Sequence, residues 1–419
     1  MRQSDVSNTF LHGTLTGDVY VEQPPGFVYF EFPSHVCHLN MSLYSLKQAP
    51  RAWFDKFSGF LLSYGFTQSI CDHSMFFHSK AGVKMILLVY VDDIILVGNS
   101  DSNLTSFIST LKTQFALKDL GPLSYFLGIE PKLDTSTNSL LLTQNKYSIE
   151  LLKKFDMLEC KPCTSPVASG RRASLYDGTL LEDSAYYRSL VGALQYLTLT
   201  RPDVSFLVNY VAQFMHQPTD VHLQLAKRIL RFIKGSLGTG ITLVGGDCSS
   251  ITAFTDSDWA GFPDSRNTTS GYCVFLGQNL VAWSSKKQPT QSHSSTKAEY
   301  KALSVAASEI RWISYIMDEL GDHIRYPCTM FCDNIGAGSL TANPICHART
   351  KHVELDYHSV RSLVMLGFST VRYIPSLQNI VDLFTKGLPK QLFTKLQDKL
   401  LHFHSVQIKG DCKNKKVFS

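Results

Sequence analysis

Two features are missing from this chain of 419 residues, and each absence excludes a class of protein. No run of about eighteen apolar residues occurs, so no membrane-spanning helix and no membrane partner are expected. The first twenty residues lack a basic start followed by an apolar run, which predicts an intracellular protein of the cytoplasm or nucleus that is not secreted. With 40 Lys and Arg against 35 Asp and Glu, the net charge of +5 allows a polyanionic partner without requiring one.

The ten cysteines form no obvious framework. Cys160 and Cys163 have the spacing of a zinc-binding pair, but nothing in the sequence brings a second pair to them. Structural thiols in a reducing compartment are the preferred interpretation.

The chain contains enough apolar material for buried cores, because 44% of its residues are hydrophobic. At roughly 100–200 residues per domain, its length predicts two to four domains. The patterns predict an α/β region in residues 1–135, a mainly helical region in 136–245, an α/β domain in 246–400 and a basic tail in 401–419. The predicted helices of the second region are 145–155, 186–199 and 221–234, where apolar residues recur at steps of three and four.

Residues 246–400 alternate between strand and helix patterns. The predicted strands are 251–256, 271–276, 280–285, 328–333 and 369–375, and the predicted helices are 295–320, 353–366 and one from Gln378. Three strands followed by alternating helices and strands indicate an α/β layer fold with a mixed sheet.

Four carboxylates fall where this fold would bring them together. Asp256 is predicted at the end of the first strand, Glu299 in the first turn of the long helix, Asp333 at the end of the fourth strand, and Asp382 near the start of the last helix. Each alone is more typical of a helix cap or a solvated charge, but the set predicts a metal centre at one sheet edge. Asp258 is the main rival ligand, and Asp256 is preferred because it follows the apolar strand directly.

Asp92 and Asp93 separate two apolar runs, residues 85–91 and 94–97. A two-residue turn between buried strands would place both carboxylates at an exposed tip. Aspartate suits turns, yet two adjacent like charges also favour a bound cation. The spacing alone leaves both interpretations open.

Several sequence motifs favour the metal-binding interpretation. YVDD (residues 90–93) resembles the polymerase motif of reverse transcriptases, and DVSNTFLHG (5–13) resembles their first aspartate motif. SLYSLKQAPRAWF (42–54), QPPGF (23–27), KDLG (118–121) and YFLGIE (125–130) resemble the signatures of copia-class LTR retrotransposons. The resemblance implies a reverse transcriptase palm in residues 1–135 and a thumb and connection in 136–245.

The same resemblance implies roles for individual residues. Asp5 and Asp92 would hold two Mg²⁺ ions, with Asp93 assisting. The ions would bind at the 3′-hydroxyl of a DNA primer that is extended on an RNA template. The implied substrate-binding residues are Phe10 under the sugar, Lys47 and Arg51 near template and nucleotide, and Leu127 and Gly128 in a segment that grips the primer.

The C-terminal domain resembles the RNase H domain of copia-class elements. The matching words are FTDSDWAG (254–261), TSGYCVF (269–275), WSSKKQP (283–289), KAEYKAL (297–303), CDN (332–334), RTKHVE (349–354) and VDLFTK (381–386). This resemblance implies a two-Mg²⁺ ribonuclease, with Asp256, Glu299, Asp333 and Asp382 as ligands, that cuts the RNA strand of an RNA–DNA hybrid.

Two departures from the family bear on activity. The chain starts four residues before Asp5, so the fingers are expected to be absent, and Ser45 stands where the family has glycine. Polymerase activity is therefore expected to be lost or very weak. The alternatives are a non-catalytic relic of a decayed retroelement, and an active reverse transcriptase within a longer polyprotein. The oligomeric state stays open.

Two basic groups have no assigned role. Lys227, Arg231 and Lys234 form a stripe at helical spacing, and Lys286 lies beside Lys287. A solvated face and a hybrid-binding face are equal alternatives for both groups.

Overall fold

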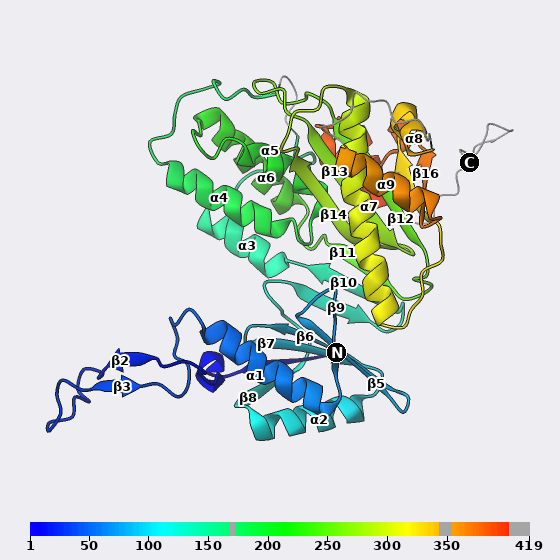
Figure 1. The fold of residues 1–419 in the computed structure, drawn as a ribbon. Coiled ribbons are helices and arrows are strands. Elements are labelled where there is room, and N and C mark those ends of the chain that lie inside the picture. The colour runs from blue at the N-terminus through cyan, green and yellow to red at the C-terminus, as the bar shows by residue number, and fades with distance from the viewer. Residues whose placement is uncertain (168–171, 343–353, 402–419) are drawn as a thin grey trace. The chain divides into compact units, whose positions relative to one another are not determined.

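The computed structural model describes residues 1–167, 172–342 and 354–401, with residues 342 and 354–358 described by their backbone alone. The chain divides into two compact units, Met1–Ser124 and Tyr125–Ser419 (Figure 1). Both units combine helices with sheets, so the predicted α/β class is confirmed. The predicted basic tail falls almost entirely on residues 402–419, which lie outside the described residues.

The first unit is built on a six-stranded sheet with the order β4-β5-β6-β7-β1-β8. The strands are β1 (Arg2–Val6), β4 (Thr67–Gln68), β5 (Met75–Lys80), β6 (Val83–Tyr90), β7 (Asp93–Gly98) and β8 (Leu117–Pro122). Helices α1 (Ala49–Tyr64) and α2 (Asp101–Gln114) share one apolar core with the sheet. A short hairpin, β2 (Tyr20–Glu22) with β3 (Val36–His38), and a 3₁₀ helix, Thr9–His12, complete the unit.

Helix α1 illustrates how local sequence determines an element. Pro50 stands in its first turn, where the missing N–H costs no hydrogen bond. Trp53, Phe57 and Leu61 recur at four-residue steps and are all buried, which turns one face of the helix to the sheet. Gly65 ends the helix with a φ of 108°, a conformation that favours glycine.

The β6–β7 hairpin turns one residue earlier than the sequence predicted. Tyr90 pairs with Asp93, so the two turn residues are Val91 and Asp92, and Asp93 begins β7. Val91 has a φ of 56°, which is unusual for a β-branched residue. The indole N–H of the buried Trp53 donates to the Val91 carbonyl at 2.8 Å and holds the turn there.

The second unit contains two sheets. A small sheet has the order β11-β10-β9, from β9 (Glu130–Asp134), β10 (Ser139–Thr143) and β11 (Ile241–Val244). The larger sheet has the order β14-β13-β12-β15-β16, from β12 (Ile251–Asp258), β13 (Thr269–Leu276), β14 (Asn279–Lys287), β15 (Cys328–Cys332) and β16 (Ser369–Tyr373). β12, β13 and β14 are antiparallel, whereas β15 pairs in parallel with both β12 and β16, so the sheet is mixed as predicted.

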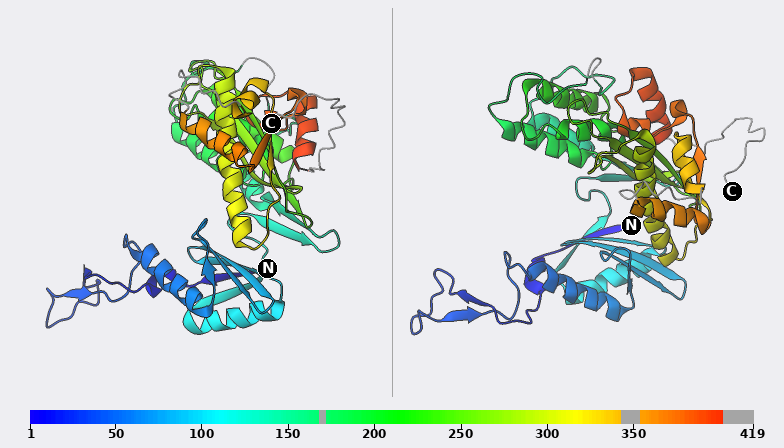
Figure 2. Two further views of the ribbon diagram at one scale, coloured as in Figure 1. Left: turned by 45° about the vertical axis from the view of Figure 1, so that its right-hand side comes forward. Right: turned by 45° about the horizontal axis from the view of Figure 1, so that its top comes forward.

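Helices cover both faces of the five-stranded sheet (Figures 1 and 2). On one side lie α7 (Ser295–Glu319), α8 (Ile335–Ala342) and α9 (Glu354–Met365), which share a core with β12, β13 and β15. The other side packs against α3 (Asn145–Lys154), α4 (Ser184–Leu197), α5 (Ser205–Ala212), α6 (Asp220–Gly235), α10 (Asp382–Thr385) and α11 (Lys390–Leu401). The helices before the sheet therefore share one core with it.

A buried ion pair ties the helical region to the end of the chain. Arg201 and Asp203 have side chains only 3% and 0% exposed, and they meet at 2.8 Å. Gln397 of α11 donates to the same Asp203 carboxylate at 2.7 Å. Both charges are thus paired inside the core, which buried charges require.

The structure differs from the predicted elements in several places. The region predicted as mainly helical also supplies β10 and β11, and the first unit ends at Ser124 because the next strand, β9, pairs with β10. β12 runs two residues beyond Asp256, and α8 is an additional helix. The predicted last helix is divided into a 3₁₀ helix, Ser376–Gln378, α10 and α11, and Gly387 and Pro389 interrupt it between α10 and α11.

None of the helices in the described parts of the chain is long and apolar enough to cross a membrane.

Candidate metal centre

Asp256 is the most deeply buried member of the acidic group. It lies within β12 rather than at its end, and it is 1% exposed. Its carboxylate accepts a short hydrogen bond from the Thr385 hydroxyl, and its Oδ1 lies 3.1 Å from the Lys386 ammonium. Burial raises the pKa of Asp256, while the charge of Lys386 opposes that shift.

Asp333 follows directly after β15. Because β15 pairs in parallel with β12, their carboxyl ends lie at the same sheet edge and Asp333 arrives beside Asp256. The Ser376 hydroxyl donates to its Oδ2 at 2.7 Å.

Asp382 is the first residue of α10 rather than part of a long last helix. Its Oδ1 lies 2.6 Å from the Lys386 Nζ, one helical turn further along the chain. Burial first, and then the charge of Asp256, raises the pKa of Asp382 to about 6. One ligand atom from each of Asp256, Asp333 and Asp382 lies within 4.8 Å of the others.

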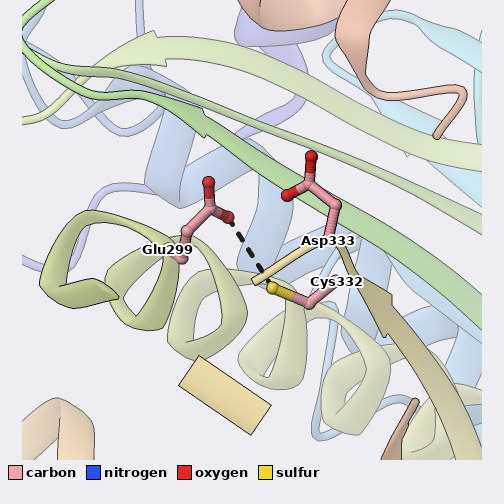
Figure 3. A group of neighbouring side chains, drawn as sticks. All are labelled: Glu299, Cys332 and Asp333. Atoms are coloured by element: carbon pink, nitrogen blue, oxygen red, sulfur yellow. Dashed lines mark hydrogen bonds between the residues drawn. The ribbon is translucent and has the colours of Figure 1, made fainter. Parts of the chain in front are cut away.

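Glu299 approaches from the helix that covers the sheet. It lies in the second turn of α7, one turn later than predicted, and accepts the Ser257 backbone N–H at 3.1 Å. Figure 3 shows its side chain directed toward Cys332 and Asp333, with the Cys332 thiol donating to it at 3.7 Å. Burial, and then the charges of Asp256 and Asp333, raise the pKa of Glu299 to about 9.

Two overlapping ligand groups result. Asp256, Asp333 and Asp382 form one, and Glu299, Cys332 and Asp333 form the other, so Asp333 belongs to both. The raised pKa values show that the carboxylates resist being charged together in a buried place. A divalent cation would remove this resistance, and hard carboxylate oxygens are the ligands that Mg²⁺ prefers. The four carboxylates therefore fit such an ion, whereas the Cys332 thiol, whose pKa burial raises, is not a ligand of this kind.

The rival ligand Asp258 is occupied elsewhere. Its carboxylate forms an ion pair with Arg172 at 2.5 Å, and Arg172 also donates to the Gly261 carbonyl at 2.5 Å. Asp258 belongs to neither ligand group among the described residues. The preference for Asp256 agrees with this geometry.

Lys386 and Thr385 are site residues that no pattern in the sequence singles out. Lys386 places its ammonium between Asp256 and Asp382, and those two carboxylates raise the pKa of the lysine. Cys332 is equally unexpected, because its thiol is buried against Glu299 and burial raises its pKa. In the sequence, these three residues are indicated only by their position beside predicted acidic ligands, within the motifs VDLFTK and CDN.

The aspartates of the first unit are also neighbours. Asp5 of β1 is the register partner of Asp93 of β7, and Asp92 accepts the Val6 N–H through its backbone carbonyl at 2.9 Å. Burial raises the pKa of Asp93, and the charges of Asp92 and Asp5 add to that shift. Among the described residues, however, these three do not form a group whose ligand atoms all lie within 4.8 Å.

The predicted substrate-binding residues of the first unit lie in the 3₁₀ helix (Phe10), in the turn before α1 (Lys47) and in α1 (Arg51). Phe10 packs edge-on against Tyr44, with ring centroids 5.2 Å apart. Lys47 is exposed, and Arg51 is 88% exposed in a loose pair with Asp55 at 3.8 Å. Ser45 has a φ of 73°, so glycine suits this position through its backbone conformation, and serine there costs about 1–2 kcal/mol.

Leu127 and Gly128 belong to the second unit. Both have positive φ, 45° and 73°, in a tight turn closed by the bridge between Phe126 and Ile129. The Tyr196 hydroxyl donates a short hydrogen bond to the Leu127 carbonyl. A Cβ at position 128 would lie 3.0 Å from the Tyr196 ring, so glycine is needed for space as well as conformation.

The predicted basic stripe on α6 is partly used in packing. The Lys234 ammonium donates a short hydrogen bond to the Leu158 carbonyl, while Arg231 is exposed. The motif at residues 349–354 falls on masked positions apart from the backbone of Glu354, so the rest of it lies outside the described residues.

Residues 1–169 match the family described as Reverse transcriptase (RNA-dependent DNA polymerase). RNase H1 from Halobacterium salinarum NRC-1 is similar over 32% of this chain and 94% of its own, at 15% identity and a TM-score of 0.24. The match makes the N-terminal part of the chain similar to reverse transcriptases, and the acidic ligand groups lie beside the five-stranded mixed sheet in the C-terminal part of the chain.

Relatives narrow the class to one family. The chain is 44% identical over 400 residues to the Retrovirus-related Pol polyprotein from transposon RE1 of Arabidopsis thaliana, covering 96% of this chain and 27% of that protein. It is 30% identical over 308 residues to the putative transposon Ty5-1 protein of Saccharomyces cerevisiae, covering 73% of this chain and 100% of that protein. The chain belongs to the copia-type Pol polyprotein family, and spans about a quarter of the length of the RE1 polyprotein.

A first prediction concerns pH. Because the folded-state pKa values of Asp382 and Glu299 are raised, protonation favours the folded state, and that stability is lost as the pH rises through about 6 and about 9. We expect the melting temperature of the metal-free protein to fall across this range, and Mg²⁺ to raise it most at the alkaline end. Calorimetry with Glu299→Gln should show a flatter profile above about pH 6. Identical pH profiles of the melting temperature for the two proteins would contradict this prediction.

A second prediction concerns Lys386. Lys386→Met keeps the aliphatic stem and removes the ammonium between two buried carboxylates, so the metal-free protein should lose about 1–3 kcal/mol of stability. Added Mg²⁺ should recover most of the loss, because it supplies the missing positive charge. Lys390→Met, at an exposed position on α11, is the matched control. Equal effects of the two substitutions in urea denaturation would contradict the prediction.

Proposed function

We propose that the second unit is a magnesium-dependent ribonuclease that cuts the RNA strand of RNA–DNA hybrids. The observation that carries the proposal is the pair of ligand groups that share Asp333. Two adjacent cation positions with a common carboxylate are the arrangement that two-metal phosphodiester hydrolysis needs.

The residues would divide the work as follows. Asp256, Asp333 and Asp382 would hold one Mg²⁺, and Glu299 with Asp333 would hold the other. When bound, the two ions would activate a water and stabilise the leaving 3′-oxygen. Ser376 holds the Asp333 carboxylate and the Ser257 N–H holds Glu299, so both ligands are oriented before an ion arrives.

The proposed substrate is distinguished by its sugar. An RNA strand paired with DNA presents 2′-hydroxyls in a shallow minor groove, and these groups separate a hybrid from duplex DNA. The proposed partners are therefore an RNA–DNA hybrid for the second unit, and an RNA template with a DNA primer for the palm of the first unit.

The nuclease is tested by removing the shared ligand. Asp333→Asn should reduce cleavage of a labelled hybrid roughly a thousandfold, because a lost metal contact costs several kcal/mol of transition-state stabilisation. Asp322→Asn, at an exposed position after α7, should cleave like the unaltered chain. If the folded, unaltered chain does not cleave with Mg²⁺, the non-catalytic relic becomes the better description.

DNA synthesis is a second candidate function, and the pairing of Asp5 with Asp93 favours it. We expect extension of a DNA primer on an RNA template to be absent or very weak, since the three aspartates form no compact ligand group in the described residues. Asp92→Asn should leave hybrid cleavage unchanged. Robust extension that this substitution abolishes would instead support an active reverse transcriptase.

A further inference from the structure

A second polar site lies on β14, on the side of the sheet that faces the preceding helices. A cleft of about 320 Å³ lies among α4, α5 and β14. Its lining includes Ser205 and Asn209 of α5, Thr198 after α4, and Trp283, Ser285 and Lys286 of β14. None of these residues belongs to the acidic groups described above.

Three buried polar atoms in this lining have no hydrogen-bond partner. They are the Ser205 hydroxyl, the Asn209 amide nitrogen and the Ser285 hydroxyl. Ser205 is 8% exposed, and Asn209 follows it by one helical turn, so both occupy the same face of α5. Leaving such a group unsatisfied costs about 1–3 kcal/mol. Their gathering around one cleft points to a missing binding partner.

The missing partner must accept hydrogen bonds. An amide nitrogen can only donate, and both hydroxyls can donate. Lys286 adds a positive charge, and no Asp or Glu is among the residues that line the cleft. Neutral donors around one cation suit an oxyanion, and phosphate supplies several acceptor oxygens at once.

We propose that this cleft binds a backbone phosphate of the nucleic acid on which the second unit acts. The inference rests on the proposed function for the identity of the nucleic acid, and it gives Lys286 a role that the sequence left open. The cleft is held in shape independently of any ligand, because the Trp283 indole N–H donates to the Thr198 carbonyl at 3.1 Å. Phosphate contacts of this kind position a duplex without reading its sequence.

The test measures binding without cleavage. A fluorescent RNA–DNA hybrid is titrated with the full chain in EDTA, across a range of salt concentrations, with anisotropy as the readout. Lys286→Gln should weaken binding several-fold and reduce the slope of log affinity against log salt by about one, the value for one lost phosphate contact. Asn209→Asp should weaken binding at least as much, because a carboxylate would repel the phosphate.

Lys287→Gln is the matched control. Lys287 is the next residue of β14 but does not line the cleft, and its ammonium lies 5.9 Å from the Phe262 ring centroid. It should leave the salt slope unchanged. Equal slopes for Lys286→Gln and the unaltered chain, or an equal reduction by both lysine substitutions, would overturn the proposal.

A second arm separates a backbone phosphate from a free one. If inorganic phosphate stabilises the unaltered chain but not Asn209→Asp, while both bind the hybrid equally, the cleft binds a free anion and the proposal is overturned. Because EDTA prevents catalysis, these outcomes do not depend on the nuclease. If the chain cleaves hybrids but Lys286→Gln has no effect on binding, only the phosphate-binding proposal is contradicted. If Lys286→Gln weakens binding but the chain never cleaves hybrids, only the nuclease proposal is contradicted.

Discussion

The mutual repulsion of carboxylates in a buried place is the constraint on which the site depends. Asp256 and Asp382 are nearly inaccessible to solvent, and their charges are tolerated because the Lys386 ammonium lies between them. The parallel pairing of β15 with β12 adds Asp333, and α7 adds Glu299. The fold thus concentrates negative charge at one sheet edge, where only a cation can stabilise it fully. The proposed magnesium ions would neutralise this negative charge.

The helices that precede the five-stranded sheet are part of the same scaffold. They bury one face of that sheet, and the Arg201–Asp203 pair with Gln397 joins them to α11. α10, which carries Asp382, packs between those helices and the sheet. The position of an acidic ligand therefore depends on helices far earlier in the chain. The same packing creates the cleft on β14, because α5 covers that strand.

Much of this organisation follows from sequence patterns. The strand patterns between residues 251 and 285 and the long apolar stripe of α7 predict three strands and a helix, and all four are present. Other features depend on contacts that no local pattern contains. The turn at Val91 is one residue early because Trp53, distant in sequence, holds its carbonyl. Asp258 lies two residues from Asp256 on the same strand, yet Asp256 meets Asp333 and Asp382 whereas Asp258 pairs with Arg172.

The sequence by itself determined the α/β class, the order of the main elements in residues 246–400, the family and the four acidic residues, because periodicity and motif words are local properties of a chain. The tertiary structure decided which carboxylates meet, which residues neutralise them and how the chain divides into units. Lys386 and Cys332 lie in the site because a short helix and a parallel strand bring them there. Burial and charge proximity arise only when distant segments pack together, so they are invisible in a linear pattern.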